Sequence, residues 1–184
     1  MKRNLLTIIL AMTLGTATAQ QLSVNTDVAT DLLMAPNLGA ELTVGNRSTL
    51  GLNVIGAYKP WGKRIKMLGV QPEYRYYVSG RPMHKLFVGI GAVAGFYDAT
   101  IRGKVYDGIA YGGGLTFGYV LNITKRLNID FHSGLSVVRY DRKEYYDGDN
   151  YNNDYIINGS NKTNATGYYL MPSRIGVSIT YILK

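Results

Sequence analysis

The sequence predicts an all-β protein, an eight-stranded, antiparallel, up-and-down transmembrane β-barrel. In eight separate segments, apolar residues recur at every second position, which is the period of a strand with one apolar face. These segments are about as long as the 9 to 11 residues with which a tilted strand crosses a bilayer. Glycine (22 residues) and tyrosine (16 residues) are abundant in this chain of 184 residues, as expected for strands and turns.

The N-terminal segment, residues 1–19, has the pattern of a cleaved signal peptide. Lys2 and Arg3 precede an apolar run, and Ala17 and Ala19 provide the small residues that a signal peptidase requires. The apolar run is shorter than the roughly 20 residues of a membrane-spanning helix. We therefore expect cleavage after Ala19, and residues 20–184 form one exported barrel domain.

Four predicted strands occupy the first half of the mature chain. They span residues 22–32, 38–44, 50–58 and 68–78, each with leucine, valine or tyrosine at alternate positions. Threonine, glycine, asparagine and glutamate fill the positions between. This alternation predicts that each strand has one apolar and one polar face.

Four more predicted strands follow. They span residues 86–96, 111–121, 127–137 and 175–183. An even number of strands leaves both ends of the chain on the same side of a membrane, which in an outer membrane is the periplasmic side.

The connections between strands alternate in length. Those expected to be short are 45–48, 79–84 and 122–126, and those expected to be long are 59–66, 98–109 and 141–167. The first connection, 34–37, is an exception. Short periplasmic turns and long outer loops are typical of bacterial outer-membrane barrels.

The polar face predicts which side of the barrel contacts lipid. A soluble barrel would expose this face to water and would be expected to carry lysine there, yet the alternating polar positions contain none. Its glycines suit the crowded lumen of an eight-stranded barrel. The charged residues on this face, predicted to pair across the lumen as a structural network, are Glu41, Glu73, Arg75, Asp130 and Arg174.

The chain offers few residues for catalysis or metal binding. It has no cysteine, and its two histidines are His84 and His132, which argues against a transition-metal site. His132 and Asp130 share a face, but alternation directs Ser133 to the other face, so a serine, histidine and acid triad is not expected. We expect no enzyme activity and no cofactor.

A basic loop is a candidate for contact with lipid headgroups. It contains Lys59, Trp61, Lys63, Arg64 and Lys66 and no acidic residue. On an outer surface these bases could hold phosphates of outer-membrane lipid while the tryptophan anchors at the interface. The alternative is a solvated basic loop. The formal net charge of +8 does not indicate nucleic-acid binding, because the signal peptide directs the chain out of the cytoplasm.

The longest loop, residues 141–167, is rich in tyrosine and asparagine. This composition is found in recognition surfaces that combine rigid aromatic area with adaptable hydrogen bonds. An extracellular protein or a glycan is the partner that such a surface would bind. The alternative is a polar cap without a ligand.

The last strand resembles the C-terminal signal that the barrel assembly machinery recognises in outer-membrane proteins. That signal has a polar residue, a glycine two positions later and alternating hydrophobic residues that end on an aromatic. Arg174, Gly176, Ile179 and Tyr181 match it, although the chain continues to Lys184.

Nearly the whole mature chain resembles small uncharacterised outer-membrane barrels of Bacteroidota, a domain-of-unknown-function family of OmpA/OmpX-like eight-stranded barrels. The matching stretches are PNLGAEL (36–42), STLGLNV (48–54), QPEYRYY (71–77), YGGGLTFGYVL (111–121) and KRLNIDFHSGL (125–135). The resemblance implies a fold and an outer-membrane location, and it implies no reaction or ligand.

The expected function is therefore that of a non-enzymatic integral outer-membrane protein, structural or interacting through its extracellular loops. Two alternatives remain open at this point. One is an outer-membrane enzyme that modifies lipid, which would need a clustered nucleophile, base and acid. The other is a soluble periplasmic barrel that binds a ligand.

Overall fold

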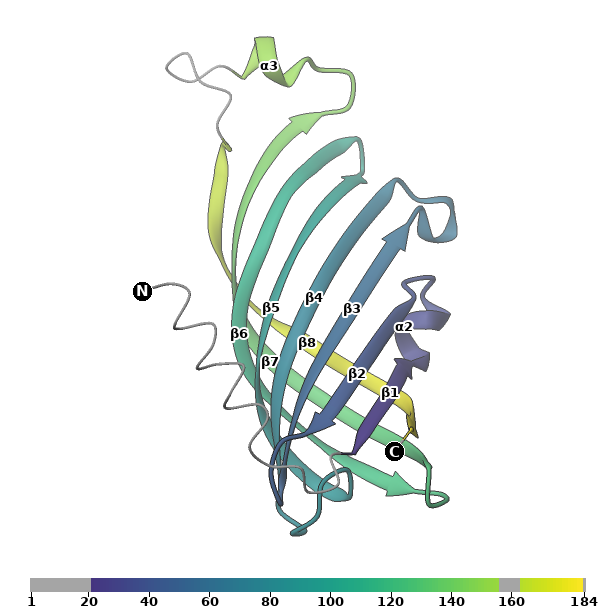
Figure 1. The fold of residues 1–184 in the computed structure, drawn as a ribbon. Helices are drawn as coiled ribbons and strands as arrows, with labels where there is room; N and C mark the ends of the chain where they lie inside the picture. The colour runs from purple at the N-terminus through teal and green to yellow at the C-terminus, as the bar shows by residue number, and fades with distance from the viewer. Residues whose placement is uncertain (1–20, 156–162, 184) are drawn as a thin grey trace, which may run out of the picture.

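The computed structural model describes residues 21–155 and 163–183. Eight antiparallel strands, each hydrogen-bonded to the next along the chain, form a closed barrel in which β8 returns to β1 (Figure 1). The strands are β1 (Leu22–Asp27), β2 (Asn37–Thr43), β3 (Ser48–Tyr58), β4 (Ile65–Tyr77), β5 (Lys85–Ile101), β6 (Lys104–Asn122), β7 (Leu127–Tyr146) and β8 (Ala165–Ile182). The predicted eight-stranded, up-and-down fold is confirmed. The predicted signal peptide lies outside the described residues.

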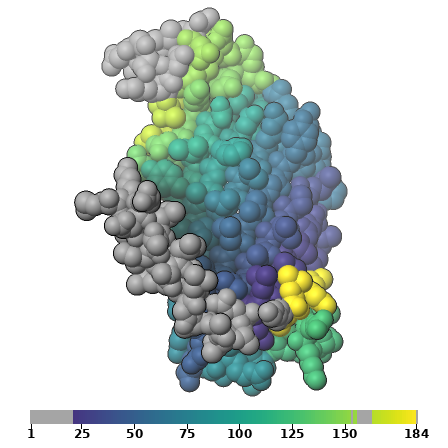
Figure 2. Space-filling model, in the orientation of Figure 1, coloured from purple at the N-terminus to yellow at the C-terminus, as the bar shows by residue number. Residues whose placement is uncertain are grey.

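The barrel wall is much taller on one side than on the other. Strands β1 and β2 have 6 and 7 residues, whereas β5 to β8 have 17 to 20. The turns β2–β3, β4–β5 and β6–β7 lie together at the lower end in Figure 1, and the tall strands rise at the opposite end. The space-filling view shows the same asymmetry between the purple N-terminal strands and the teal and green ones (Figure 2).

The side chains divide between the two faces of the sheet as the period of two requires. Apolar residues on the outer face are exposed, for example Leu38 at 67%, Ile90 at 60% and Leu115 at 65%. Charged and polar residues on the inner face are buried, among them Glu73 and Arg75. We call the band of exposed apolar residues the apolar belt.

The first predicted strand, 22–32, is wrong in its second half. β1 ends at Asp27, and a short helix, α2 (Val28–Leu32), follows it. The Asp27 carboxylate caps this helix by accepting hydrogen bonds from the backbone N–H groups of Ala29 and Thr30. The alternation of Val28 and Leu32 with polar residues is compatible with a strand and with a helix. The cap at Asp27 favours the helix.

Two predicted long loops are also wrong in extent. The loop expected at 98–109 is a two-residue turn, because β5 and β6 continue to Ile101 and Lys104. Arg102 and Gly103 both have positive φ (52° and 78°), which is the geometry of a tight hairpin. The loop expected at 141–167 is shorter than predicted, because β7 extends to Tyr146 and β8 begins at Ala165. It contains the short helix α3 (Tyr151–Asp154).

The lower end of the lumen is closed by apolar side chains. Tyr77, Phe87 and Val120 form a buried cluster, and Met83 from the β4–β5 turn is 3% exposed. The Met83 carbonyl accepts a hydrogen bond from the Asn122 amide at 3.0 Å, which holds the turn against the lumen. In the described part of the chain, no helix is long and apolar enough to cross a membrane.

Candidate functional site

The barrel interior brings together the five charged residues predicted for the lumen. Arg75 lies at their centre and is 2% exposed. Its guanidinium donates to Glu73 at 3.0 Å, to Glu41 at 3.3 Å and to Asp130 at 2.6 Å. Arg174 donates to the same Glu73 oxygen at 2.6 Å. These residues come from β2, β4, β7 and β8, so the network joins opposite walls of the barrel.

Neutral groups add further hydrogen bonds to this network. The hydroxyls of Thr49 and Tyr77 donate to one oxygen of Glu41, at 2.5 and 2.7 Å. Thr116 donates to Glu73, and the Phe87 ring lies 4.3 Å from the Arg75 guanidinium carbon. Buried charges are tolerated when they are paired and hydrogen-bonded in this way, whereas removal of one partner leaves a buried charge uncompensated.

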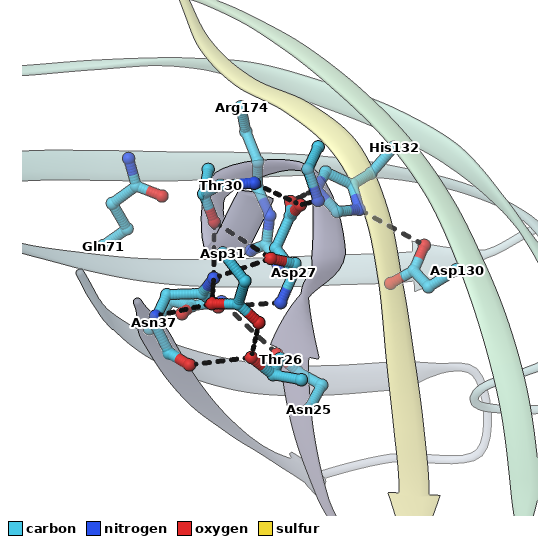
Figure 3. Close-up of polar contacts among 12 residues, drawn as sticks. Asn25, Thr26, Asp27, Thr30, Asp31, Asn37, Gln71, Asp130, His132 and Arg174 are labelled. Atoms are coloured by element: carbon cyan, nitrogen blue, oxygen red, sulfur yellow. Dashed lines mark hydrogen bonds and ion pairs between the residues drawn. The ribbon is translucent and has the colours of Figure 1, made fainter. Parts of the chain in front are cut away.

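A second buried pair, between Asp27 and His132, lies above the Arg75 network. The His132 ring nitrogen Nε2 is 2.8 Å from an Asp27 carboxylate oxygen, and Nδ1 is 3.9 Å from Asp130 (Figure 3). The Asp27 carboxylate thus links α2 to β7 across the intervening strand β8. Sequence reasoning missed Asp27, although an aspartate three residues before Thr30 and ahead of two leucines is a helix N-cap signal.

Gly176 provides the space for the Asp27 carboxylate. A Cβ atom at this position would lie 2.2 and 2.5 Å from the two Asp27 carboxylate oxygens. Gly176 pairs with His132 across the β7–β8 ladder. The absence of a side chain at residue 176 therefore allows Asp27 to reach His132.

The other residues of the predicted assembly signal lie on both faces of β8. Arg174 is in the lumen network, whereas Ile179 and Tyr181 are exposed on the outer face at 46% and 43%. Each of the four residues therefore also has a place in the folded barrel.

Above the apolar belt, Arg142 is enclosed by tyrosines on the inner face of the tall wall. Its guanidinium carbon lies 4.3 Å from the Tyr140 ring and 4.9 Å from the Tyr106 ring. Glu144 accepts hydrogen bonds from Lys104 and from Arg142. These donors, Lys104 first, lower the pKa of the Glu144 carboxyl below its ordinary value.

The tip of the tall wall, formed by the β7–β8 connection, presents packed tyrosine rings. Tyr151 and Tyr155 stack with ring centroids 5.3 Å apart, and Tyr145 packs against both rings. Tyr155 donates to Asp149 at 2.8 Å. The described part of the predicted recognition loop is therefore a compact aromatic surface around α3.

The structure divides the predicted basic loop between a 3-10 turn and a strand. Lys59, Trp61 and Lys63 lie in or beside the turn η1 (Pro60–Gly62), and Trp61 is 69% exposed. Lys66 lies in β4, 4.0 Å from Asp98. Arg64 pairs with Asp147. Asp98 of β5 and Asp147, which follows β7, thus partly neutralise the loop. Trp61 lies beside Met34, which follows α2.

His84 lies at the lower mouth, where its ring contacts the Asn122 side chain. The nearest cavity there has a volume of about 700 Å³ and is lined by Arg81, Lys125 and Asn46, among others. Among the described residues, no three His, Asp or Glu side chains are grouped so as to hold a metal ion.

This geometry defines a class of protein: a closed eight-stranded barrel with an apolar outer face and a filled, ion-paired lumen. A family model described as protein of unknown function (DUF3575) matches residues 5–183, and the chain belongs to this family. No curated protein and no solved structure matches it.

Proposed function

We propose that this protein is a non-enzymatic, integral outer-membrane barrel of a Gram-negative bacterium, with a structural or surface-interaction role through its extracellular loops. The main support is the arrangement of the two faces. Leucine, isoleucine, valine and phenylalanine are exposed around the outside, while Arg75 and its carboxylates are buried inside. Water would favour the opposite arrangement, and lipid favours this one.

The location proposed for the chain is the outer membrane, reached after removal of residues 1–19 and insertion by the barrel assembly machinery. The signal-peptide pattern and the match of Arg174, Gly176, Ile179 and Tyr181 to the assembly signal support this route. We also propose a relationship to the OmpA/OmpX-like barrels of Bacteroidota, supported by the sequence stretches quoted above.

The packed, ion-paired lumen argues against a channel along the barrel axis. Arg75 fills the interior between β2, β4 and β7, and Met83 and Phe87 close the lower end. A lumen of eight strands is just wide enough for such side chains. The surface that remains for interaction is the tyrosine-rich tip around α3, which we propose contacts an extracellular protein or a glycan.

Fractionation of cells that express the full chain tests the membrane proposal. We expect the protein to remain with outer membranes after washes in high salt and in alkaline carbonate, and to be extracted only by detergent. Recovery in the wash or in the soluble periplasm would overturn the proposal and favour a soluble ligand-binding barrel.

The single tryptophan, Trp61, reports on the proposed contact of Lys59, Lys63, Arg64 and Lys66 with headgroups. In vesicles with brominated lipids, we expect stronger quenching of its fluorescence by bromine near the headgroup than by bromine near the chain end. Equal and weak quenching by both lipids would favour the solvated loop.

A further inference from the structure

The interruption of β1 leaves an opening in the barrel wall. β1 pairs with residues 178–182 of β8 only, whereas β7 pairs with β8 as far as Ala165. Residues 165–177 of β8 therefore have a strand partner on one side alone among the described residues. The helix α2 takes the place of a longer β1 and lies against β8.

A cavity of about 240 Å³ lies at this opening, and we call it the lateral cavity. Asn53 and Gln71 line it from the inner face of β3 and β4. Pro172 and Ile175 line it as well, although they pair with Leu135 and with Ser133 of β7, which alternation assigns to the outer face. The lining of the cavity therefore includes residues that alternation assigns to both faces of the sheet, beside the gap left by β1.

The opening lies at the level of the apolar belt. Leu135, the partner of Pro172, is 54% exposed on the outside, and Ile175 is 61% exposed. Within a bilayer, unpaired backbone groups are tolerated only where they are covered by protein or line a hydrated cavity. One such group, the Ser173 carbonyl at the β-bulge, accepts a hydrogen bond from Gln71 at 3.0 Å.

The polar groups of the cavity indicate the chemistry that it accepts. Its two charged residues, Asp27 and Arg174, have opposite sign. Asp27 is already paired with His132 (Figure 3), and Arg174 is paired with Glu73. The amides of Asn53 and Gln71 also line it, whereas the amide of Asn37, a further lining residue, is already hydrogen-bonded to Asp27 and Thr30. The Asn53 and Gln71 amides can each both donate and accept, which suits neutral hydroxyl and amide groups better than a further charge.

We propose that the lateral cavity binds the neutral, hydroxyl-rich headgroup of an amphiphile, such as a glycolipid, whose apolar tail leaves through the opening into the membrane. The volume equals that of about eight water molecules, which is enough for a single sugar. The two elements beside the opening carry exposed apolar residues, Leu32 of α2 at 70% and Leu170 of β8 at 74%. The inference rests on the proposed membrane location.

Single cysteines test the opening, because the chain has no cysteine of its own. The variants are Ile175→Cys at the opening, Leu115→Cys on the belt with a similar exposure of 65%, and Lys63→Cys in the exposed loop as a reference that the reagent can reach from water. Each is reconstituted into vesicles and treated with a water-soluble maleimide. We expect Ile175→Cys to react about tenfold faster than Leu115→Cys.

The outcomes separate this inference from the proposed function. Fast labelling of both Ile175→Cys and Leu115→Cys would overturn the membrane location and the inference with it. Slow labelling of both would overturn the opening alone. Each variant is first checked for folding by the heat dependence of its electrophoretic mobility, so that labelling is measured only on closed barrels.

The ligand class is tested by protection of Ile175→Cys from the maleimide. Hexyl glucoside is expected to slow labelling about tenfold, whereas glucose and hexyl phosphate at the same concentration should not. Adding Asn53→Leu should remove the protection, and adding Asn46→Leu, at a turn at the other end, should retain it. Protection by hexyl phosphate, or none by hexyl glucoside, would overturn the proposed headgroup.

Discussion

The lower and upper halves of the barrel wall differ in how their strands are paired. In the lower half β8 pairs with both β7 and β1, and the lumen is filled by the Arg75 network. In the upper half β1 is absent, and α2 lies beside the edge of β8. Most of this difference follows from one residue, since Asp27 ends β1, caps α2 and pairs with His132.

The comparison teaches that the same alternating sequence pattern supports two different structures. Below Asp27, alternation is fixed by burial of one face, because a slip of one residue would move the buried charges to the apolar outer face. Beyond Asp27, the chain has a local alternative in the capped helix. The lower half is therefore expected to determine stability, and the upper half is free to serve binding.

The largest loss of stability is expected when Arg75, at the centre of the buried ion-pair network, is replaced. Arg75→Ala leaves Glu41, Glu73 and Asp130 without their shared partner, which should destabilise the barrel by about 3 to 5 kcal/mol. Lys63→Ala, in the exposed loop, should leave stability unchanged. Urea titration of both variants in detergent, followed by electrophoretic mobility, measures the difference. Equal stability would contradict the role assigned to the network.

A smaller effect is expected where the two halves meet. Gly176→Ala would place a Cβ atom against the Asp27 carboxylate and break its bond to His132, at a cost of about 1 to 3 kcal/mol. Gly45→Ala is the matched control, because its nearest neighbour is Ser48 at 3.8 Å. The same urea titration compares both variants with the wild type.

A double variant shows whether Gly176→Ala acts through Asp27. In an Asp27→Ala background, Gly176→Ala should cost much less than it does in the wild type, because the two residues share one interaction. Full additivity of the two costs would contradict the contact.

The smallest effect is expected at the top of the tall wall. Glu144→Gln should reduce stability at neutral pH by less than about 1 kcal/mol, because its partners are partly exposed. Since the folded pKa of Glu144 lies below its ordinary value of 4.5, its contribution is present above that pH and is lost as the pH falls. The difference from wild type should therefore close in acid, and a difference that persists there would contradict the ion pair.

Periodicity predicted the faces and the charged lumen residues well because the outer face and the lumen carry opposite kinds of side chain at neighbouring positions. It failed above the belt, where both faces of a strand meet water. Residues 98–101 and 104–109 continue the β5–β6 ladder, but Asp98, Thr100 and Asp107 interrupt the apolar period of the outer face that Phe96 and Ile109 follow below them. The turn at Arg102–Gly103 was the available signal for a hairpin.

The Asp27–His132 pair could not be predicted from sequence separation or alternation. The two residues are 105 positions apart, and they meet only because β8 returns to β1 and because residue 176 is glycine. Likewise, the lateral cavity depends on where β1 ends. The alternation of polar and apolar residues continues through α2, so the sequence pattern alone did not show that the strand ends at Asp27.

The most direct test of the central claim, a closed barrel with its apolar face in lipid, is the electrophoretic mobility of the full chain from membranes with and without boiling. A paired barrel resists detergent until it is heated, so we expect one band before boiling and a second, shifted band after it. If the protein is instead recovered from the soluble periplasm and its band has the same mobility with and without boiling, the lipid-facing barrel is contradicted.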